Sequence, residues 1–275
     1  MVNTIVISAS SDIGMSFLKN RFRSGDNLIG TYRNKSNKRN ISNFCNYSFF
    51  LDLFDETSLD NFINDLALKN IRWNRVLFCP CQPYPYKSFF KTKFSDWQNS
   101  FILNSINQLK ILHKLYSLRS KEAKVLFFAG AGTNGPVDQF SAYCSAKVHL
   151  IKMVELLDFE NKDISFSILG PGWVNTKTHL LALEHSEINS EKYNKTKEFI
   201  ENPVGETPIA EVIRSINWIF DQKKSVVGGR NFATAYDPWM KESPNYQAFI
   251  SKLIEDKNMY KLRRYGNEFF PQKNY

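Results

Sequence analysis

The chain has 275 residues, which is enough to bury a sizeable core as one large α/β domain or as two small ones. Apolar residues make up 43% of it and aromatic residues 15%, without long polar runs, which excludes general disorder. Its four cysteines are too few and too unevenly spaced for a disulfide framework or a closed zinc site. We therefore expect reduced thiols and no metal site.

The formal net charge of +9 raises the question of nucleic-acid binding. Basic residues gather in two segments, 33–39 and 257–264, but neither segment belongs to a recognisable nucleic-acid-binding module. The phosphates of a cofactor or of a sugar nucleotide would use the same charges. We expect a small-molecule partner and no nucleic acid.

Membrane insertion is not expected either. No apolar run approaches the roughly 20 residues that a membrane-spanning helix needs. Residues 1–7 lack the basic segment that precedes the apolar part of a signal peptide, and their pattern favours a first strand. These observations predict a cytoplasmic protein.

Strand-like and helix-like segments alternate from the first residue, and this order predicts a parallel sheet with helices on both faces. The expected strands cover residues 5–8, 28–32, 47–51, 76–79, 124–129, 165–169 and 225–234. The expected helices cover residues 12–23, 58–68, 96–119, 143–159, 207–220 and 246–255. The predicted fold class is a Rossmann-like, doubly wound α/β/α sandwich of three layers.

The alternation loosens after Pro171. Residues 178–203 are charged and have no strand pattern, which suits a helical flap over a substrate cleft. Residues 236–275 are aromatic and basic, and form a C-terminal extension that could cover the cleft of its own subunit or of a neighbour. Without a repeat or a linker, we expect a single domain over 1–275 with its core in 2–235.

Tyr143 and Lys147 are the candidate catalytic pair. They stand one turn apart on a predicted helix, so their side chains share a face. A nearby ammonium favours the phenolate and is expected to lower the pKa of the phenol from about 10 toward neutrality. Such a phenol can exchange a proton with a substrate hydroxyl or carbonyl. The alternative is a chance pair on a surface helix.

Three other segments have suggestive spacings. Residues 8–14, Ser-Ala-Ser-Ser-Asp-Ile-Gly, lie between the first strand and the first helix, where small residues allow a tight turn and helix N–H groups can face an anion. Trp97 and Asn104 lie on the long predicted helix, where a buried Asn would need a partner. The third segment, residues 171–176, reads Pro-Gly-Trp-Val-Asn-Thr and follows the sixth strand.

Together with Tyr143 and Lys147, these segments resemble the short-chain dehydrogenase/reductase family over about residues 2–235. That family has a T-G-x-x-x-G-x-G loop, a W-x6-N segment, a Y-x-x-x-K pair and a P-G-x-V-x-T segment. In the first of these, Ser8 replaces the first glycine and Asp12 replaces the middle one, while Gly14 is retained.

The resemblance implies a role for each matching residue. Tyr143 would be the acid or base, Lys147 would hold the cofactor ribose, and Asn104 would position a water of the proton relay at a break in its helix. Tyr32 and Arg33 end the second strand without an acidic residue, which favours NADP over NAD because a 2′-phosphate needs a cation. The implied cofactor-binding residues are Ser8, Ser10, Ser11, Asp12, Ile13, Gly14, Tyr32, Arg33, Asp52, Leu53, Cys79, Tyr143, Lys147, Pro171, Gly172, Val174 and Thr176.

The chain departs from the family at the catalytic serine, because Gly130 stands at that position. Three explanations remain open. Thr133 or Asn134 supplies the missing donor, the backbone N–H groups of the glycine-rich loop supply it, or the protein has lost redox chemistry. We expect replacement, with Thr133 as the candidate catalytic residue.

Several other residues near these segments could also affect the site. Residues 76–81 replace the family's N-N-A-G with bulkier side chains, so the cofactor cleft must be packed differently. We interpret Cys144 as a buried free thiol rather than a nucleophile. His149 is expected to pack against a neighbour. His179 is expected to be a surface histidine, with substrate contact as the alternative.

The leading hypothesis is an NADP-dependent oxidoreductase that transfers a hydride to or from a carbonyl or secondary alcohol. The segments 130–135, 155–158 and 170–174 look like a subgroup from bacterial surface-polysaccharide biosynthesis, which suggests a sugar or nucleotide-sugar substrate. A non-catalytic scaffold or binding protein is the second hypothesis, and an epimerase or dehydratase is a weaker third. The resemblance also implies a homodimer or homotetramer that packs through the helices at 96–119 and 142–159.

Overall fold

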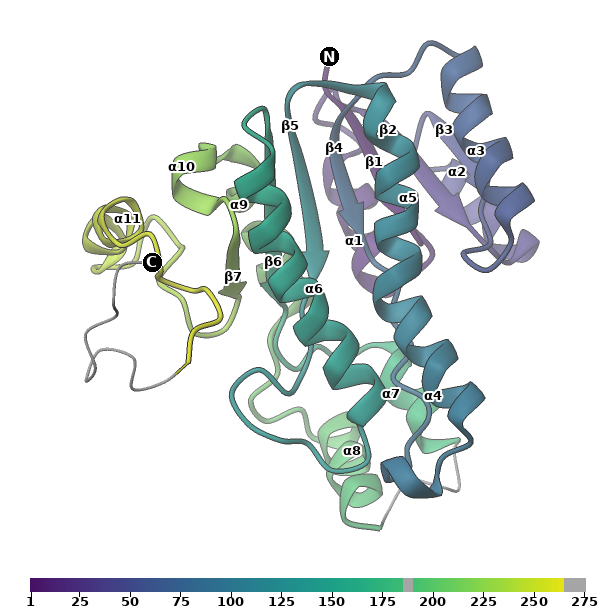
Figure 1. The fold of residues 1–275 in the computed structure, drawn as a ribbon, viewed down its shortest axis with the longest axis vertical. Helices are drawn as coiled ribbons and strands as arrows, with labels where there is room; N and C mark the ends of the chain where they lie inside the picture. The colour runs from purple at the N-terminus through teal and green to yellow at the C-terminus, as the bar shows by residue number, and fades with distance from the viewer. Residues whose placement is uncertain (185–189, 265–275) are drawn as a thin grey trace, which may run out of the picture.

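The computed structural model describes residues 1–184 and 190–264, and within them all strands form one parallel sheet (Figure 1). Neighbouring residues of a strand face opposite sides of the sheet: in β1, Ile5 and Ile7 join one core cluster and Val6 joins the other. In spatial order, the strands are β3 (Tyr47–Phe50), β2 (Asn27–Tyr32), β1 (Asn3–Ile7), β4 (Trp73–Phe78), β5 (Arg119–Phe128), β6 (Ile164–Gly170) and β7 (Arg230–Ala233).

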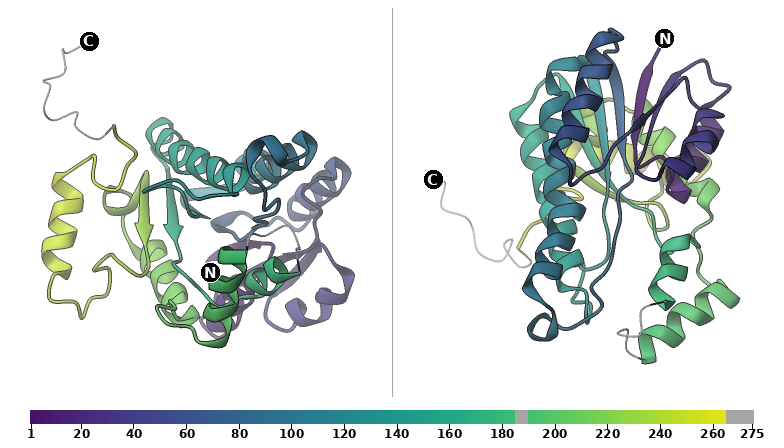
Figure 2. Two further views of the ribbon diagram at one scale, coloured as in Figure 1. Left: turned by 90° about the horizontal axis from the view of Figure 1, so that it is seen from below. Right: turned by 90° about the vertical axis from the view of Figure 1, so that its right-hand side faces the viewer.

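Helices cover both faces of the sheet, which confirms the predicted three-layer, Rossmann-like fold (Figure 2). One face carries α1 (Asp12–Arg21), α2 (Lys38–Ser42) and α9 (Ile209–Asp221). The other face carries α3 (Glu56–Leu68), α5 (Asn107–Leu115) and α6 (Ser141–Glu160). Short 3₁₀ turns occupy Lys35–Asn37, Phe89–Lys91 and Tyr116–Leu118.

The prediction of one continuous helix over 96–119 is wrong. The segment consists of α4 (Phe94–Phe101), a π-helical turn (Ile102–Ile106) and α5, and β5 then begins at Arg119 rather than at 124. The π turn is centred on Asn104, which is fully buried and whose side-chain amide donates to the Ser100 carbonyl at 2.9 Å. Side-chain competition for a backbone acceptor is a typical reason for such an irregularity.

The strand predicted at 225–234 is also wrong in its first half. A short helix, α10 (Lys224–Val227), comes first, and a two-glycine turn leads from it into β7. The Lys224 ammonium donates to the carbonyls of Asp158 and Ile164 at 2.9 and 2.7 Å and ties this turn to α6 and β6. Gly229 has a φ of +72°, a conformation that a strand does not use.

The segment expected to form a flap is helical. It contains α7 (Lys177–Leu183) and α8 (Ser190–Glu201), while residues 185–189 lie outside the described part. Both helices lie beyond the end of the sheet toward which the strands point (Figures 1 and 2).

The C-terminal extension lies on a different side of the molecule. Its helix α11 (Tyr246–Glu255) matches the predicted helix and lies beside β7 at the edge of the sheet (Figure 1). The backbone N–H of Asn231 in β7 donates to the Tyr260 carbonyl at 2.9 Å, and Arg263 pairs with Glu155 of α6 at 2.8 Å. As far as residue 264, the extension therefore packs on the last strand and on α6. The rest of it, 265–275, lies outside the described residues.

No helix in the described part of the chain is both long and apolar enough to cross a membrane. In the same residues, no three His, Cys, Asp or Glu side chains come together as a metal site would require.

Candidate active site

The predicted phosphate-binding loop lies at the carboxyl end of β1, where ligands of open parallel sheets bind. Ser8 has a φ of +58°, which explains why a glycine is the usual choice at this place. Ser11 caps α1, because its Oγ accepts a hydrogen bond from the Gly14 N–H at 3.0 Å. A Cβ at Gly14 would lie 2.8 Å from Ser11 Oγ and 3.0 Å from Ala9 Cα, so only glycine fits this tight turn.

Asp12, in place of the family's middle glycine, is engaged by a residue that the sequence reasoning missed. Its Oδ2 accepts a hydrogen bond from the backbone N–H of Lys177 at 2.8 Å. The Lys177 ammonium donates to the Ser10 carbonyl at 2.5 Å. Lys177 therefore ties the start of α7 to the phosphate-binding loop and places a cation beside it.

Tyr143 and Lys147 share one face of α6, as the spacing predicted. The Lys147 ammonium lies 5.8 Å from the centroid of the Tyr143 ring and donates to the Phe128 carbonyl at 3.0 Å. Lys147 is 1% exposed, and its burial lowers the pKa of its ammonium.

The expected lowering of the pKa of Tyr143 is wrong for this structure. Burial of the hydroxyl raises that pKa well above its usual value, and the neighbouring Cys81 raises it further. The net shift is upward although the Lys147 ammonium lies 5.8 Å from the ring centroid. At neutral pH, Tyr143 is a phenol and not a phenolate.

Gly130, at the position of the missing serine, lies directly against Tyr143. A Cβ on Gly130 would be 2.6 Å from the Tyr143 hydroxyl oxygen, which is closer than real side chains approach. In the turn that follows, Thr133 is half-buried and Asn134 is exposed. A Cβ at Gly132 would likewise meet the Cys144 side chain, 2.9 Å from its Sγ. The role expected for Thr133 stays a prediction.

Two cysteines from the end of β4 reach this site, and both are free thiols. Cys79 is buried, and burial raises the pKa of its thiol to about 12, although a hydrogen bond with the Ser11 side chain works in the opposite direction. Cys81 is exposed, and its Sγ lies 3.7 Å from the Tyr143 hydroxyl. The sequence predicts Cys79 near the cofactor, whereas Cys81 is not among the predicted site residues.

Asn104 holds the loop that carries these cysteines. Its Oδ1 accepts from the Gln82 N–H at 3.1 Å, and its Nδ2 donates to the Gln82 carbonyl at 2.7 Å. Its own carbonyl accepts from the Gln108 side chain at 3.0 Å. The break in the helix at Asn104 was expected, whereas these two hydrogen bonds to the backbone of Gln82 were not.

The segment after β6 approaches the same end of the sheet. Gly172 has a φ of +81°, and a Cβ there would fall on the hydroxyl of Thr207, so glycine is required. Val174 is buried, while Trp173 is 55% exposed. Pro171 and Thr176 are half-buried at either end of the segment.

His179 and His149 both pack against aromatic rings. The ring of His179 lies 5.1 Å from that of Phe199 and 6.4 Å from that of Trp173, so it is half-buried rather than a plain surface histidine. Burial lowers the pKa of His179. His149 packs on Phe101 at 5.7 Å and hydrogen-bonds Ser105 Oγ at 2.5 Å, as the packing interpretation predicted.

The residues expected to contact the adenosine half lie at the ends of β2 and β3. Tyr32 is buried against Phe50, and Arg33 is exposed. The Asp52 carboxylate accepts from the Phe54 N–H at 3.0 Å and forms a local turn before α3, while Leu53 packs partly against the core. Their contact with a cofactor stays a prediction.

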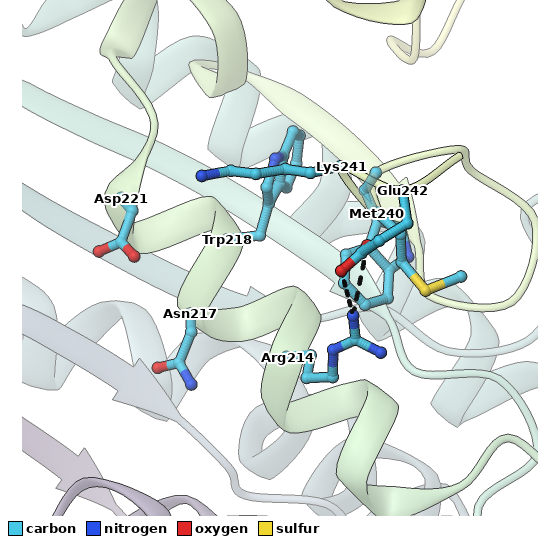
Figure 3. A pocket seen from close by; sticks show the side chains of 8 residues that line it. Arg214, Asn217, Trp218, Asp221, Met240, Lys241 and Glu242 are labelled. Carbon is cyan, nitrogen blue, oxygen red and sulfur yellow. Dashed lines mark hydrogen bonds and ion pairs between the residues drawn. The ribbon is translucent and has the colours of Figure 1, made fainter. Parts of the chain in front are cut away.

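A hollow on α9 lies apart from these residues (Figure 3). Arg214 and Trp218 of α9 form one wall, and the segment from Trp239 to Glu242 forms the other. Arg214 pairs with Glu242 at 3.3 Å and lies over the Trp239 ring at 5.9 Å. This hollow is the seam along which the C-terminal extension packs on α9.

Comparison with known proteins relates the fold to solved structures. No protein-family model matches the chain, and no curated protein matches it. A short-chain dehydrogenase/reductase from Saccharomyces cerevisiae is similar at a TM-score of 0.76 and 15% identity, over 90% of this chain and 99% of that one. A variant of actinorhodin polyketide ketoreductase with NADPH is similar at 0.72 and 14%, over 84% and 95% of the two chains.

A third solved structure, an aldohexose dehydrogenase from Thermoplasma acidophilum, is similar at a TM-score of 0.70 and 13% identity, over 84% of this chain and 91% of that one. The chain therefore has the fold of the short-chain dehydrogenases/reductases over most of its length.

Proposed function

We propose that the protein is an NADP-dependent oxidoreductase that transfers a hydride between the nicotinamide and a carbonyl or secondary alcohol. One observation carries the proposal: the Tyr143 hydroxyl lies at the carboxyl end of β5 beside the buried Lys147, on the same edge of the sheet as the phosphate-binding loop. A proton donor beside a dinucleotide site is what carbonyl reduction requires.

The residues of the loop fit a dinucleotide. The left-handed Ser8 and the crowded Gly14 build a tight turn before α1, so that the N-terminus of a ten-residue helix can face the pyrophosphate. The Lys177 ammonium adds a positive charge beside the loop. The cofactor would supply the hydride, while these residues bind and orient its phosphates.

A preference for NADP is supported by Arg33. It is exposed at the end of β2, and the segment after it carries Lys35, Lys38 and Arg39. No acidic side chain stands at this strand end to repel a 2′-phosphate or to hold a 2′-hydroxyl. The structure of the polyketide ketoreductase variant, which has a similar fold, was solved with NADPH, and this agrees with the proposal.

Tyr143 would donate its proton to the substrate oxygen in reduction and accept it in oxidation. Lys147, held by the Phe128 carbonyl, would contact the ribose, and Asn104 would keep the loop over the site in position. The sugar or nucleotide-sugar substrate is a finer proposal. It is supported by the resemblance of segments 130–135 and 170–174 to polysaccharide enzymes and by the fold shared with an aldohexose dehydrogenase.

We further propose self-association through the helical face at α4–α6. Leu156 and Phe159 on α6 are 41% and 76% exposed, and Ile106 in the π turn is 40% exposed. Light scattering after size exclusion should give the mass of a dimer or a tetramer, and Phe159→Glu should shift it toward a monomer. A monomeric wild-type protein would contradict this part of the proposal.

The cofactor is tested by fluorescence titration with NADPH and with NADH. We expect NADPH to bind at least 10-fold more tightly, and Arg33→Glu to remove most of that difference because it replaces the cation with a repelling charge. Arg23→Glu is the control, since it makes the same charge change on an exposed residue just after the far end of α1.

Turnover is tested by following NADPH consumption with a panel of aldoses, ketoses and simple ketones. Tyr143→Phe should abolish turnover while leaving NADPH affinity within about 2-fold. If NADPH does not bind at millimolar concentration, the oxidoreductase proposal is overturned. If NADPH binds and no carbonyl is reduced, the non-catalytic scaffold hypothesis is favoured instead.

A further inference from the structure

The Tyr143 hydroxyl has an unusual neighbour, the Cys81 thiol. The sulfur lies 3.7 Å from the hydroxyl oxygen, within hydrogen-bond range for sulfur. The two residues come from different elements, the loop after β4 and the start of α6, so their contact depends on the tertiary fold. Cys45 and Cys79 are buried, whereas Cys81 is exposed.

The glycine at residue 130 explains why a group from another element, the Cys81 thiol, lies beside the Tyr143 hydroxyl. A side chain at residue 130 would collide with the Tyr143 hydroxyl, because even a Cβ would be only 2.6 Å away. A serine at the end of β5 and the observed position of Tyr143 are therefore incompatible. Residue 130 itself therefore cannot place a polar side chain beside this hydroxyl, whereas the loop after β4 does place one there.

The position of Cys81 is fixed from both sides. The next residue, Gln82, is held through both its N–H and its carbonyl by the buried Asn104. The preceding Pro80 carbonyl accepts from the Gln108 side chain at 3.4 Å. The thiol is therefore held against the phenol by buried anchors rather than by a free surface loop.

Cys81 differs from the other polar residues of the site in being exposed to solvent. Lys147 is 1% exposed and Asn104 is 0% exposed, and both already make hydrogen bonds to backbone atoms. Cys81 is exposed and touches the hydroxyl. A proton that passes through the thiol can move between the half-buried phenol and water.

We propose that Cys81 is the proton-relay residue of this site and returns a proton to Tyr143 after each reduction. The inference rests on the proposed oxidoreductase function. In reduction, the carbonyl carbon accepts the hydride that the cofactor supplies, and its oxygen takes the Tyr143 proton, which leaves a phenolate. The thiol then gives its proton to that phenolate and the thiolate regains one from water, so sulfur is neither oxidised nor consumed.

The electrostatics of Tyr143 agree with this direction. Burial raises the pKa of its hydroxyl, so a phenolate formed there readily takes up a proton from a neighbouring donor.

The contact between thiol and phenol is tested without substrate. Cys81 is alkylated with iodoacetamide over a range of pH in wild type and in Tyr143→Phe, and the modified peptide is quantified by mass spectrometry. We expect the pH dependence of Cys81 alkylation to change when the phenol is removed, because the thiol then loses its hydrogen-bond partner. Identical pH profiles in the two proteins overturn the proposal, whether or not NADPH binds.

The relay itself is tested by turnover of Cys81→Ala on the best carbonyl of the panel. We expect turnover to fall on the order of 100-fold, with NADPH affinity unchanged and with partial rescue by imidazole buffer, which replaces the missing acid. Cys45→Ala controls for loss of a thiol elsewhere, since Cys45 hydrogen-bonds to Ile41 behind β2. Wild-type turnover in Cys81→Ala, or a loss that imidazole does not restore, overturns the relay.

Discussion

The Tyr143 hydroxyl occupies the space in which a side chain of residue 130 would begin, because it lies 2.6 Å from the position of a Cβ on Gly130. The glycine is therefore more than a missing serine. It allows the phenol to lie against the end of β5, and the phenol in turn fills the space that the glycine leaves. The two residues depend on each other, and each should tolerate substitution poorly while the other is unchanged.

Gly130→Ser, which restores the family's residue, is expected to impair the protein. The new side chain must displace Tyr143 or strain β5, so we expect a loss of about 1–3 kcal/mol in the free energy of unfolding and turnover that is slower by roughly 10-fold or more. Urea denaturation and NADPH consumption measure the two effects. Gly135→Ala is the matched control, because a Cβ at Gly135 would meet nothing within 4 Å. Faster turnover in the Gly130→Ser variant would contradict the observed packing.

Asn104→Ala is expected to release the loop after β4. The change removes hydrogen bonds to both backbone groups of Gln82 and to the Ser100 carbonyl, at a cost of about 2–4 kcal/mol in unfolding free energy. Hydrogen exchange of residues 79–87 should accelerate more than exchange of the strands. Asn99→Ala, at an exposed position in the same helical segment, should change neither measurement.

Lys177→Ala is expected to weaken NADPH binding by roughly 3 to 10-fold at low ionic strength, because it removes a cation beside the phosphate-binding loop. The difference from wild type should shrink as salt is added, since the charge is exposed. Lys197→Ala removes an exposed flap lysine that pairs with Glu201 at 3.8 Å, and it should bind NADPH normally. Equal affinities of Lys177→Ala and wild type at every salt concentration would exclude this role.

The pH dependence of turnover should reflect the raised pKa of Tyr143. Carbonyl reduction needs the protonated phenol, so its rate should stay level through neutral pH and decline only as the pH rises through the raised pKa. Alcohol oxidation needs the phenolate, so its rate should keep rising with pH without levelling off below about pH 10. Rate profiles in both directions between about pH 6 and 10 test this, given the ordinary phenol value of about 10. A pKa near neutrality in the oxidation profile would show that Lys147 dominates instead.

The order of strands and helices could be predicted because it depends on local patterns. Each strand is a short apolar run, and its two faces contact opposite layers, as Ile5 and Val6 do. The break at Asn104 was expected from the family resemblance, but the hydrogen bonds of its side chain to Gln82 were not. The helix α10 was predicted as strand, and the Lys224 ammonium at its start bonds to α6 and β6. These distant partners are not visible from the neighbouring sequence.

In the candidate site too, some features could be predicted from local spacing and others could not. The spacing of Tyr143 and Lys147 sufficed to place both on one face of α6. The pKa of the phenol was misjudged because burial, which spacing does not reveal, outweighs the lysine charge. Cys81 was missed because residues 76–81 were interpreted only for their bulk in the cofactor cleft, and Lys177 was missed because it lies just past the segment 171–176. One signal was available for such residues: a thiol or a cation that follows a strand leading into the site is a candidate site residue.

The Asn231–Tyr260 hydrogen bond helps to protect the edge of the sheet from aggregation. An edge strand normally leaves a row of unpaired N–H and C=O groups with which a strand of another molecule can pair. Here part of that row is already bonded to the chain that follows α11, which occupies the outer side of β7. Truncation before residue 246 should expose this row and promote aggregation, even though the catalytic groups would be untouched.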